Sequence, residues 1–139
     1  MMPEPFVLKE PSTDDEKEIL NLLRGFIAGF FRKKTEMLGE LFSEDIVVRS
    51  GAVGNKFPLD KENYLKKIKE VINTISYYNF FDVFIKVGDK TNAQVFCTAQ
   101  WLHLRKRVPD RARLKFVFIN EKGKWFINGI TYIDDSLIY

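Results

Sequence analysis

One carboxylate in the C-terminal half of the sequence stands among aromatic residues. Asp82 lies in a strand-like segment, and alternation of side chains places it on the same predicted face as Phe80, Phe84 and Phe96. Burial among rings raises the pKa of a carboxyl group, so Asp82 is a candidate general acid or base near neutral pH. The alternative interpretation is that Asp82 lies at the rim of a cavity and only accepts hydrogen bonds from a backbone amide or from Thr98.

The other reactive residue types are scarce. The chain has one histidine, His103, and one cysteine, Cys97. His103 falls near the end of a predicted strand with no nucleophile nearby, which favours a structural role. Cys97 has apolar neighbours, and we interpret it as a small buried residue rather than a reactive thiol. Since there is no cluster of metal-ligand residues and no glycine-rich phosphate loop, we expect no metal and no cofactor.

Composition places the chain among ordinary globular domains. It has 139 residues, of which 45% are hydrophobic and 29% charged, and its net charge is +3. This length fits one domain, and the small net charge gives no reason to expect a nucleic-acid partner. The first ten residues lack the basic start and apolar run of a secretory signal, and no apolar stretch is long enough to span a membrane. We therefore expect a cytoplasmic protein.

The candidate residues must be positioned by helices that come first in the chain. Residues 1–12 hold three of the five prolines and are predicted to form an extended arm, followed by one domain over residues 13–139. Thr13 and Glu16 form a capping box at the start of a long amphipathic helix. A short helix is predicted over residues 35–42, a strand over 45–49 and a loop over 51–59. Asp60 caps a third helix.

Strands fill the rest of the chain. Four are predicted, over residues 77–87, 93–107, 113–120 and 124–133, with turns between them that favour hairpins. Helices followed by an antiparallel meander indicate an α+β fold with three helices and a curved antiparallel sheet, rather than alternating β/α units.

The two short turns predict which side chains share a face of the sheet. If Val87 pairs with Ala93 and Asn120 pairs with Lys124, one face of the sheet is aromatic and contains scattered polar groups. We expect the helices to cover this face and leave a cavity for a small, mostly apolar molecule. Its predicted lining is Phe26 and Phe30 from the first helix with Tyr78, Phe80, Phe96, Thr98, Gln100, Phe116, Asn128 and Tyr132 from the sheet.

The opposite face is also apolar, and three helices cannot cover both faces. A second apolar face left in water would be unusually large, so we expect it to be the interface of a homodimer. Its predicted residues are Val83, Val95, Cys97, Ala99, Trp101, Trp125 and Ile127. A one-residue slip at either turn would exchange the two faces.

Positive charge concentrates in the segment over residues 105–115. It contains six basic residues against one acidic residue, whereas the rest of the chain is slightly acidic. Such a segment could dock an anionic partner. The alternative is a solvated hairpin whose charges prevent association of strand edges.

Several short pieces of the sequence, in their order and spacing, resemble the nuclear transport factor 2-like superfamily, which includes the SnoaL-like polyketide cyclases. The pieces are the capped first helix, residues 41–46 (LFSEDI), the turn at 87–89 leading into 93–95, and residues 121–125 (EKGKW). They span residues 14–133. The resemblance implies a cone-shaped sheet wrapped around the first helix, a cavity between them, and a dimer through the outer face of the sheet.

The superfamily includes enzymes, transport adaptors and assembly domains, so the resemblance does not imply one function. The ketosteroid isomerase branch has a carboxylate base after the first strand, a tyrosine on the first helix and an aspartic acid on a later strand. These positions correspond here to about Ser50, to Phe26 and Phe30, and to Lys115 or Phe116, which argues against that chemistry. The epoxide hydrolase pattern needs two aspartates bridged by an arginine, and only Asp82 is predicted in the pocket.

Three functional hypotheses remain open at this point. The first is a dimeric domain that binds a small molecule in its aromatic cavity. The second is a cofactor-free lyase or isomerase of the SnoaL-like kind, with Asp82 as acid or base and Tyr78 or Tyr132 stabilising an enolate. The third is an adaptor that docks an anionic partner through residues 105–115.

Overall fold

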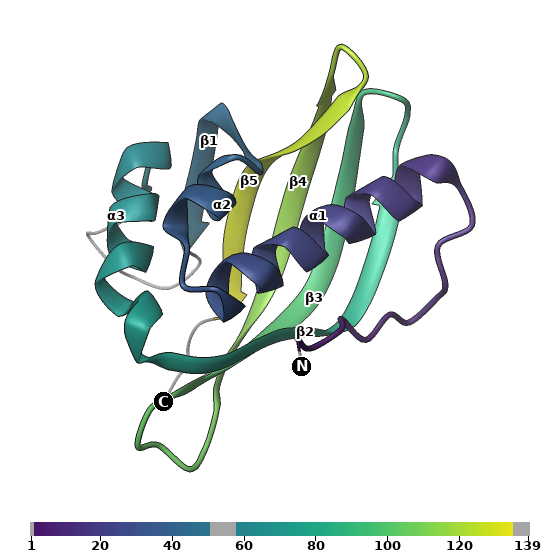
Figure 1. The fold of residues 1–139 in the computed structure, drawn as a ribbon. Helices are drawn as coiled ribbons and strands as arrows, with labels where there is room; N and C mark the ends of the chain where they lie inside the picture. Colours follow the sequence, from purple (N-terminus) through teal and green to yellow (C-terminus); the bar gives the residue numbers. More distant parts are fainter. Residues whose placement is uncertain (1, 51–57, 135–139) are drawn as a thin grey trace.

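The computed structural model describes residues 2–50 and 58–134, so most of the predicted 51–59 loop lies outside the described residues. Figure 1 shows the helices and the sheet. The elements in chain order are α1 (Asp14–Phe31), α2 (Thr35–Gly39), β1 (Phe42–Ser50), α3 (Lys61–Val71), the short 3-10 helix η1 (Ile72–Thr74), β2 (Ile75–Val87), β3 (Asn92–His103), β4 (Asp110–Glu121) and β5 (Lys124–Asp134).

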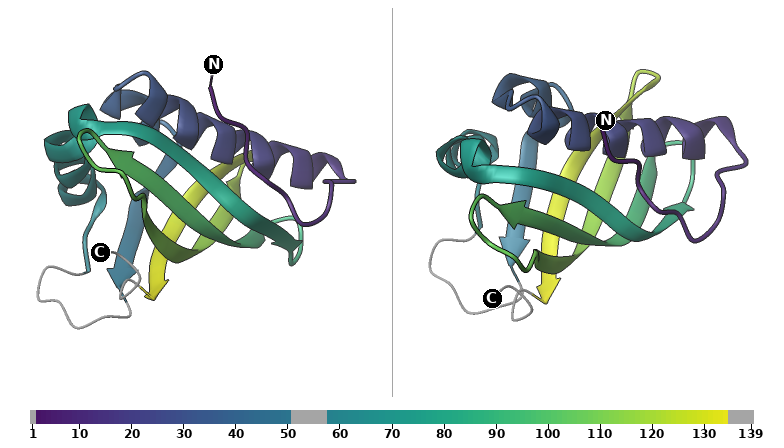
Figure 2. Two further views of the ribbon diagram at one scale, coloured as in Figure 1. Left: turned by 90° about the horizontal axis from the view of Figure 1, so that it is seen from below. Right: turned by 60° about the horizontal axis from the view of Figure 1, so that its bottom comes forward.

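The strands form one sheet in the order β1-β5-β4-β3-β2. The sheet curves around α1, which lies along its concave face, and α3 lies beside β1 (Figures 1 and 2). The predicted α+β architecture is confirmed. The sheet is not wholly antiparallel, because β1 pairs with β5 in parallel. The helix α3 and the whole meander separate these two strands in sequence, so no hairpin constrains their direction.

The predicted capping box begins α1. The Thr13 hydroxyl accepts a hydrogen bond from the Glu16 amide at 3.1 Å, and the Glu16 carboxylate accepts one from the Thr13 amide at 3.0 Å. The same carboxylate oxygen accepts from the Ser12 amide and hydroxyl. These bonds satisfy amides that a helix start otherwise leaves unpaired, which explains why the helix begins here.

The helix ends in a tight turn at Lys33. The Lys34 amide donates to Gly29 O at 2.9 Å, and the Lys33 amide donates to Phe30 O at 3.2 Å. This is the Schellman arrangement, which places Lys33 in the left-handed region with φ 59°. Glycine is the usual residue there because a side chain at positive φ is strained. A lysine at this position therefore carries a conformational cost.

Phe26 lies at the centre of the core. Its ring contacts the rings of Phe42, Tyr78, Phe80 and Phe116, with centroid distances between 5.5 and 6.1 Å. These residues come from α1 and three different strands. Burial of this aromatic cluster fixes α1 against the concave face of the sheet.

The N-terminal arm runs along β2, the edge strand opposite β1. The Phe6 amide donates to Phe80 O at 3.0 Å, and the Val83 amide donates to Phe6 O at 2.9 Å. The Phe6 ring stacks on Phe81 with centroids 5.0 Å apart. The arm therefore covers part of an edge whose backbone groups would otherwise be unpaired.

A β-bulge at Asp82 decides which side chains face α1. The predicted pairing of Val87 with Ala93 is confirmed, and it continues as far as Phe84 with Phe96. Between Phe81 and Phe84 the register shifts, and Asp82 takes φ 54°. A bulge adds one residue to one strand, so the strand's side-chain alternation changes sides there. Tyr78 and Phe80 consequently face α1, whereas Phe84 faces the opposite way.

This shift makes the predicted faces of β3 wrong. Phe80 pairs with Ala99, so Ala99 and its alternate neighbours face α1 rather than the outer surface. The predicted interface residues Val83, Val95, Cys97 and Ala99 are buried in the core, and Trp101 is half-buried on the same inner face. The predicted pocket residues Phe96, Thr98 and Gln100 lie on the outer face, where Phe96 is 36% exposed.

The hairpin between β4 and β5 also differs by one residue from the prediction. Glu121, not Asn120, pairs with Lys124. Trp125 and Ile127 therefore face the core instead of forming a dimer face, and both are buried. A second register shift beyond Ile127 returns Ile130 and Tyr132 to the inner face.

No helix among the described residues is long and apolar enough to cross a membrane.

Candidate functional site

A cavity of about 410 Å³ opens between α3 and the sheet, near the turn that joins β3 to β4. This volume lies within the range of small-molecule pockets. The cavity has an aromatic wall, a pair of tyrosine hydroxyl groups and an ion pair in its lining. These three parts come from α1, α3 and the strands β2 to β5, which only the tertiary fold brings together.

The aromatic wall consists of three rings in nearly parallel planes. Phe30 stacks on Tyr78 with centroids 4.2 Å apart and an interplanar angle of 8°. Tyr78 in turn lies 6.0 Å from the centroid of Trp101 at 16°. These rings give the cavity an apolar wall, which can bury the apolar part of a ligand.

Two hydroxyl groups form the first polar part of the lining. Tyr64 of α3 and Tyr132 of β5 approach with their hydroxyl oxygens 3.1 Å apart. Burial raises the pKa of Tyr64 well above its ordinary value, and the nearby Tyr132 raises it further. Burial likewise raises the pKa of Tyr78. These phenols stay protonated at neutral pH and can donate hydrogen bonds.

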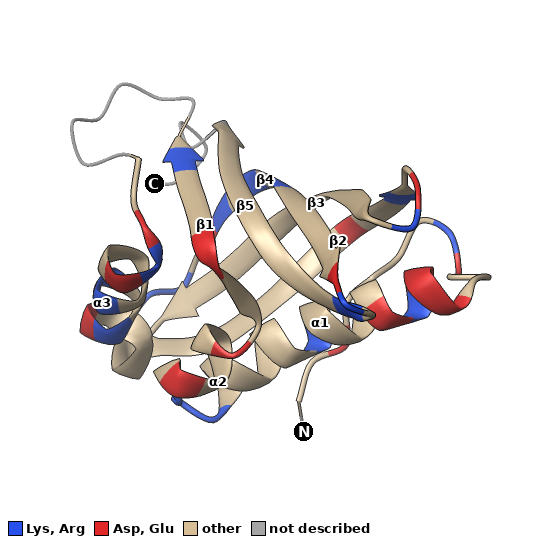
Figure 3. Ribbon diagram, turned by 90° about the horizontal axis from the view of Figure 1, so that it is seen from above, with Lys and Arg blue, Asp and Glu red and all other residues tan. Residues whose placement is uncertain are grey.

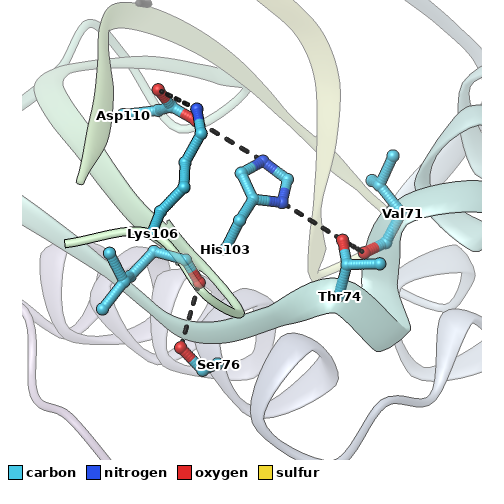
Figure 4. Close-up of polar contacts among 7 residues, drawn as sticks. Val71, Thr74, Ser76, His103, Lys106 and Asp110 are labelled. Atoms are coloured by element: carbon cyan, nitrogen blue, oxygen red, sulfur yellow. Dashed lines mark hydrogen bonds and ion pairs between the residues drawn. The ribbon is translucent and has the colours of Figure 1, made fainter. Parts of the chain in front are cut away.

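The second polar part is the network around His103, shown in Figure 4. His103 Nε2 lies 3.4 Å from Asp110 Oδ2, and Lys106 Nζ lies 3.5 Å from Asp110 Oδ1. On its other side, His103 Nδ1 lies 3.1 Å from Thr74 Oγ1, and that hydroxyl donates to Val71 O at 2.7 Å. The Asp110 side chain is only 5% exposed, so its partners compensate a nearly buried charge.

The network orients the imidazole ring of His103. Since the Thr74 hydroxyl donates to Val71 O, it accepts from His103 Nδ1. Nε2 faces the Asp110 carboxylate, with Oδ2 at 3.4 Å. Both ring nitrogens of His103 are thus engaged by the protein. The arrangement connects η1, β3 and β4 and leaves neither nitrogen aimed at a bound molecule.

Apart from Phe96, Thr98 and Gln100 on the outer face, the predicted pocket residues fall into three groups. Phe30, Tyr78 and Tyr132 line the cavity. Phe26, Phe80 and Phe116 are fully buried in the core. Asn128 does not line the cavity, and its side-chain oxygen accepts from the Ser43 hydroxyl at 2.8 Å.

The prediction that Asp82 lies in the pocket is wrong. Its position in the bulge, on the edge strand, leaves it exposed and outside the cavity lining. A carboxylate at this exposed position does not contact a molecule held in the cavity. His103, predicted on the outer face, instead lines the cavity.

Sequence reasoning missed Tyr64, Trp101 and Asp110 as cavity residues. A signal existed for Tyr64, because it lies four positions before the apolar Ile68 and so shares its helix face. Trp101 and Asp110 depend on the register past the Asp82 bulge, for which the sequence contains no comparable signal.

Comparisons with known proteins find similarity in structure only. No protein-family model matches the chain, and no curated protein sequence matches it. Among solved structures, a nuclear transport factor 2-like (NTF2-like) protein of unknown function from Pseudomonas putida KT2440 aligns with a TM-score of 0.74 and 12% identity, covering 89% of each chain. The chain has the NTF2-like fold.

Two further structures agree with the NTF2-like assignment. A cystatin-like fold protein of unknown function from Nostoc punctiforme PCC 73102 has a TM-score of 0.71 and 16% identity over 88% of this chain and 92% of that one. A protein named as a candidate scytalone dehydratase from Novosphingobium aromaticivorans DSM 12444 has a TM-score of 0.64 and 17% identity over 84% and 81%. At these identities the likeness shows the fold alone, so function must be argued from the cavity.

In the part of the chain that the structure describes, no group of three or more His, Cys, Asp or Glu side chains is arranged to hold a metal ion.

Proposed function

We propose that this NTF2-like domain binds a small, planar, mostly apolar molecule that carries one or two oxygen atoms. The observation that supports this most directly is the cavity itself, whose lining combines an aromatic wall with a pair of tyrosine hydroxyls. The wall would bury the apolar faces of the ligand, and the hydroxyls of Tyr64 and Tyr132 would bind its oxygen.

The first test is native mass spectrometry of the purified protein, which reports a retained molecule and its mass. The second uses 2-naphthol and naphthalene as probes, with affinities measured by titration calorimetry. We expect 2-naphthol to bind about threefold to tenfold more tightly, since one neutral hydrogen bond contributes about 0.5–1.5 kcal/mol. The double variant Tyr64→Phe/Tyr132→Phe should lose this preference while still binding naphthalene.

The control is Tyr77→Phe, which removes a hydroxyl that lies outside this cavity. It should leave the preference for 2-naphthol unchanged. Equal affinity for both probes in the unchanged protein would contradict the role of the hydroxyl pair. Failure of both probes to bind, with no retained mass, would contradict the binding function.

We also propose a homodimer through the outer face of the sheet, formed by residues other than those predicted. Phe84 and Phe96 pair across β2 and β3 and are 43% and 36% exposed. Val117, Ile119 and Phe126 are half-buried, and the register places them on the same face. Apolar area of this kind favours association with a second copy.

The oligomeric state tests this proposal. Light scattering after size-exclusion chromatography should give twice the mass of the chain, and Phe96→Glu should give a monomer. Gln100→Glu adds the same charge to the same face, four residues further along β3, and should remain dimeric. A monomeric protein without substitutions would exclude the dimer.

The basic segment supports a second candidate function, the docking of an anionic partner. Arg111, Arg113 and Lys115 occupy alternate positions on the outer side of β4. Within the described residues none of the three forms an ion pair, whereas Lys106 is engaged by Asp110. In Figure 3 part of β4 is blue, which marks the basic residues of this strand.

Poly-L-glutamate is a suitable probe for this candidate. Its binding should weaken steeply as salt rises, and Arg111→Gln/Arg113→Gln should weaken it at low salt. Lys66→Gln/Lys69→Gln removes the same charge from an exposed side of α3 and should have little effect. If both double variants lost the same amount of binding, the interaction would depend only on the net charge of the protein.

A further inference from the structure

A second cavity, of about 660 Å³, lies on the other side of the Phe30–Tyr78 stack. It is bounded by the end of α1, the start of β2, Leu104 and residues 2–4 of the arm. Figure 2 shows the arm passing between α1 and the edge strand β2. The two cavities share Phe30, Ile75 and Tyr78, and their other lining residues differ.

The second cavity gathers apolar surface that the fold leaves uncovered. Phe31, Tyr77 and Leu104 line it, and these side chains are 51%, 37% and 57% exposed. They come from α1, β2 and the turn after β3, so their proximity is a product of the tertiary fold. Covering apolar surface of this kind removes it from water, which favours binding of an apolar molecule.

One cation faces this apolar surface without compensation. Lys33 lines the cavity, and among the described residues its ammonium group forms no ion pair. Partial burial lowers its pKa, as expected for a charge near apolar groups. The Asn73 side chain also lines the cavity and can donate a hydrogen bond.

The other charged group in the lining already has a partner. The Glu4 carboxylate accepts from Arg24 Nε at 2.9 Å, and its backbone oxygen accepts from Asn79 Nδ2 at 2.9 Å. These contacts hold the arm over the cavity. Because Arg24 compensates Glu4, the charge available to a ligand is the positive charge of Lys33.

The cost of the Lys33 backbone supports a specific role for this side chain. Its φ of 59° belongs to a position where glycine is favoured. Strained backbone positions often occur at ligand-binding sites, so the conformation of Lys33 at this cavity supports a role in binding.

We propose that the second cavity binds an apolar molecule with a single carboxylate, of the kind represented by a medium-chain fatty acid. The carboxylate would pair with Lys33, and the hydrocarbon would lie against Phe31, Tyr77 and Leu104. Such a site is separate from the first cavity, so it does not depend on the function proposed above.

The test compares decanoate with decanol, two probes of equal chain length that differ in charge. We expect decanoate to bind about twofold to fivefold more tightly, since Lys33 is exposed and an ion pair at an exposed site contributes up to about 1 kcal/mol. Lys33→Gly should abolish this preference, and Lys33→Arg should keep it. Lys34→Gln removes the neighbouring charge, which lies outside the cavity lining, and should keep the preference as well.

Lys33→Gly separates binding from folding. Glycine suits the positive φ at this position, so the variant should be at least as stable as the unchanged protein. Loss of the preference for decanoate in a protein of undiminished stability can then be assigned to the missing ammonium group.

Methyl resonances locate the probe. Decanoate should shift the methyl signals of Leu104, which lines the second cavity. It should leave the methyl signals of Val71, which lines the first cavity, unchanged. Shifts at Val71 alone, equal affinity for the two probes, an unchanged preference in Lys33→Gly, or no binding of decanoate would each overturn the proposal. Binding of 2-naphthol in the first cavity is unaffected by these outcomes, so the two proposals fail separately.

Discussion

Glu16 shows how one side chain stabilises the start of a helix. Its Oε1 accepts from the Ser12 amide, the Ser12 hydroxyl and the Thr13 amide at 2.9–3.0 Å. These hydrogen bonds lower the pKa of Glu16 from 4.5 to about 2, and those from the Ser12 and Thr13 amides contribute most. A carboxylate whose pKa is lower in the folded protein than in the unfolded chain stabilises the fold at pH values above the unfolded pKa. This stability is lost as the pH falls through the folded pKa.

We therefore expect Glu16→Gln to be less stable than the unchanged protein at pH 7. Because the carboxylate is solvent-exposed, the difference should stay below about 1 kcal/mol. It should shrink as the pH falls from 5 to 2, since the carboxylate of the unchanged protein becomes protonated. Urea unfolding at several pH values measures this, and a difference that grows at low pH would contradict it.

Cys97 tests the orientation of β3 at the level of one residue. It faces α1, and burial raises the pKa of its thiol. The thiol should not react with Ellman's reagent in the folded protein and should react fully in guanidinium chloride. Rapid reaction under native conditions would show that Cys97 lies on the outer face, as the sequence predicted.

At the scale of elements, the close packing of α1 and α2 depends on Gly29. A Cβ atom there would lie 2.7 Å from both Cγ and Cδ2 of the fully buried Leu38. At Gly25, one α-helical turn earlier, a Cβ would lie 3.1 Å from the end of Leu41, a less buried side chain. The two glycines therefore form a matched pair within the same helix.

Gly29→Ala should destabilise the fold by up to about 2 kcal/mol, because overpacking costs about 1–3 kcal/mol and the gain in helix propensity is at most about 1 kcal/mol. Gly25→Ala should be neutral or slightly stabilising, because Leu41 can move. Thermal unfolding of both variants measures the difference. Equal stability of the two would indicate that α2 can shift away from α1.

At the scale of the whole molecule, contacts distant in sequence close the curved sheet around α1. Trp125 Nε1 donates to Asp15 at 3.1 Å, which connects β5 to the start of α1. The arm completes the opposite edge by pairing with β2 around Val83. The molecule thus has one edge covered by its own N-terminal residues, while the β1 edge lies near α3.

Removal of residues 2–8 should expose the β2 edge and the Phe81 ring on which Phe6 stacks. We expect lower thermal stability and concentration-dependent association into species larger than those of the unchanged protein, because unpaired strand edges template further pairing. Light scattering over a range of concentrations detects this. Phe6→Ala, which keeps the backbone pairing, should lose some stability without the added association.

The sequence by itself determined the local features of this protein. The capping box at Thr13 and Glu16, the helical periodicity up to Phe31 and the pairing of Val87 with Ala93 all depend on residues close together in the chain. The structure confirms each of them. The order of elements was sufficient to predict the α+β class.

Only the tertiary structure decided which faces point inward and what lines the cavity. A bulge at an ordinary aspartate leaves no mark in a period-two pattern, yet it reverses every side chain beyond it. Phe96 therefore lies on the outer face and Trp101 on the inner face, the reverse of the prediction. Asp82 lies outside the cavity, whereas His103 and Asp110 line it. Register across distant strands is set by the packing of the whole core around Phe26, and no short segment of the chain contains that information.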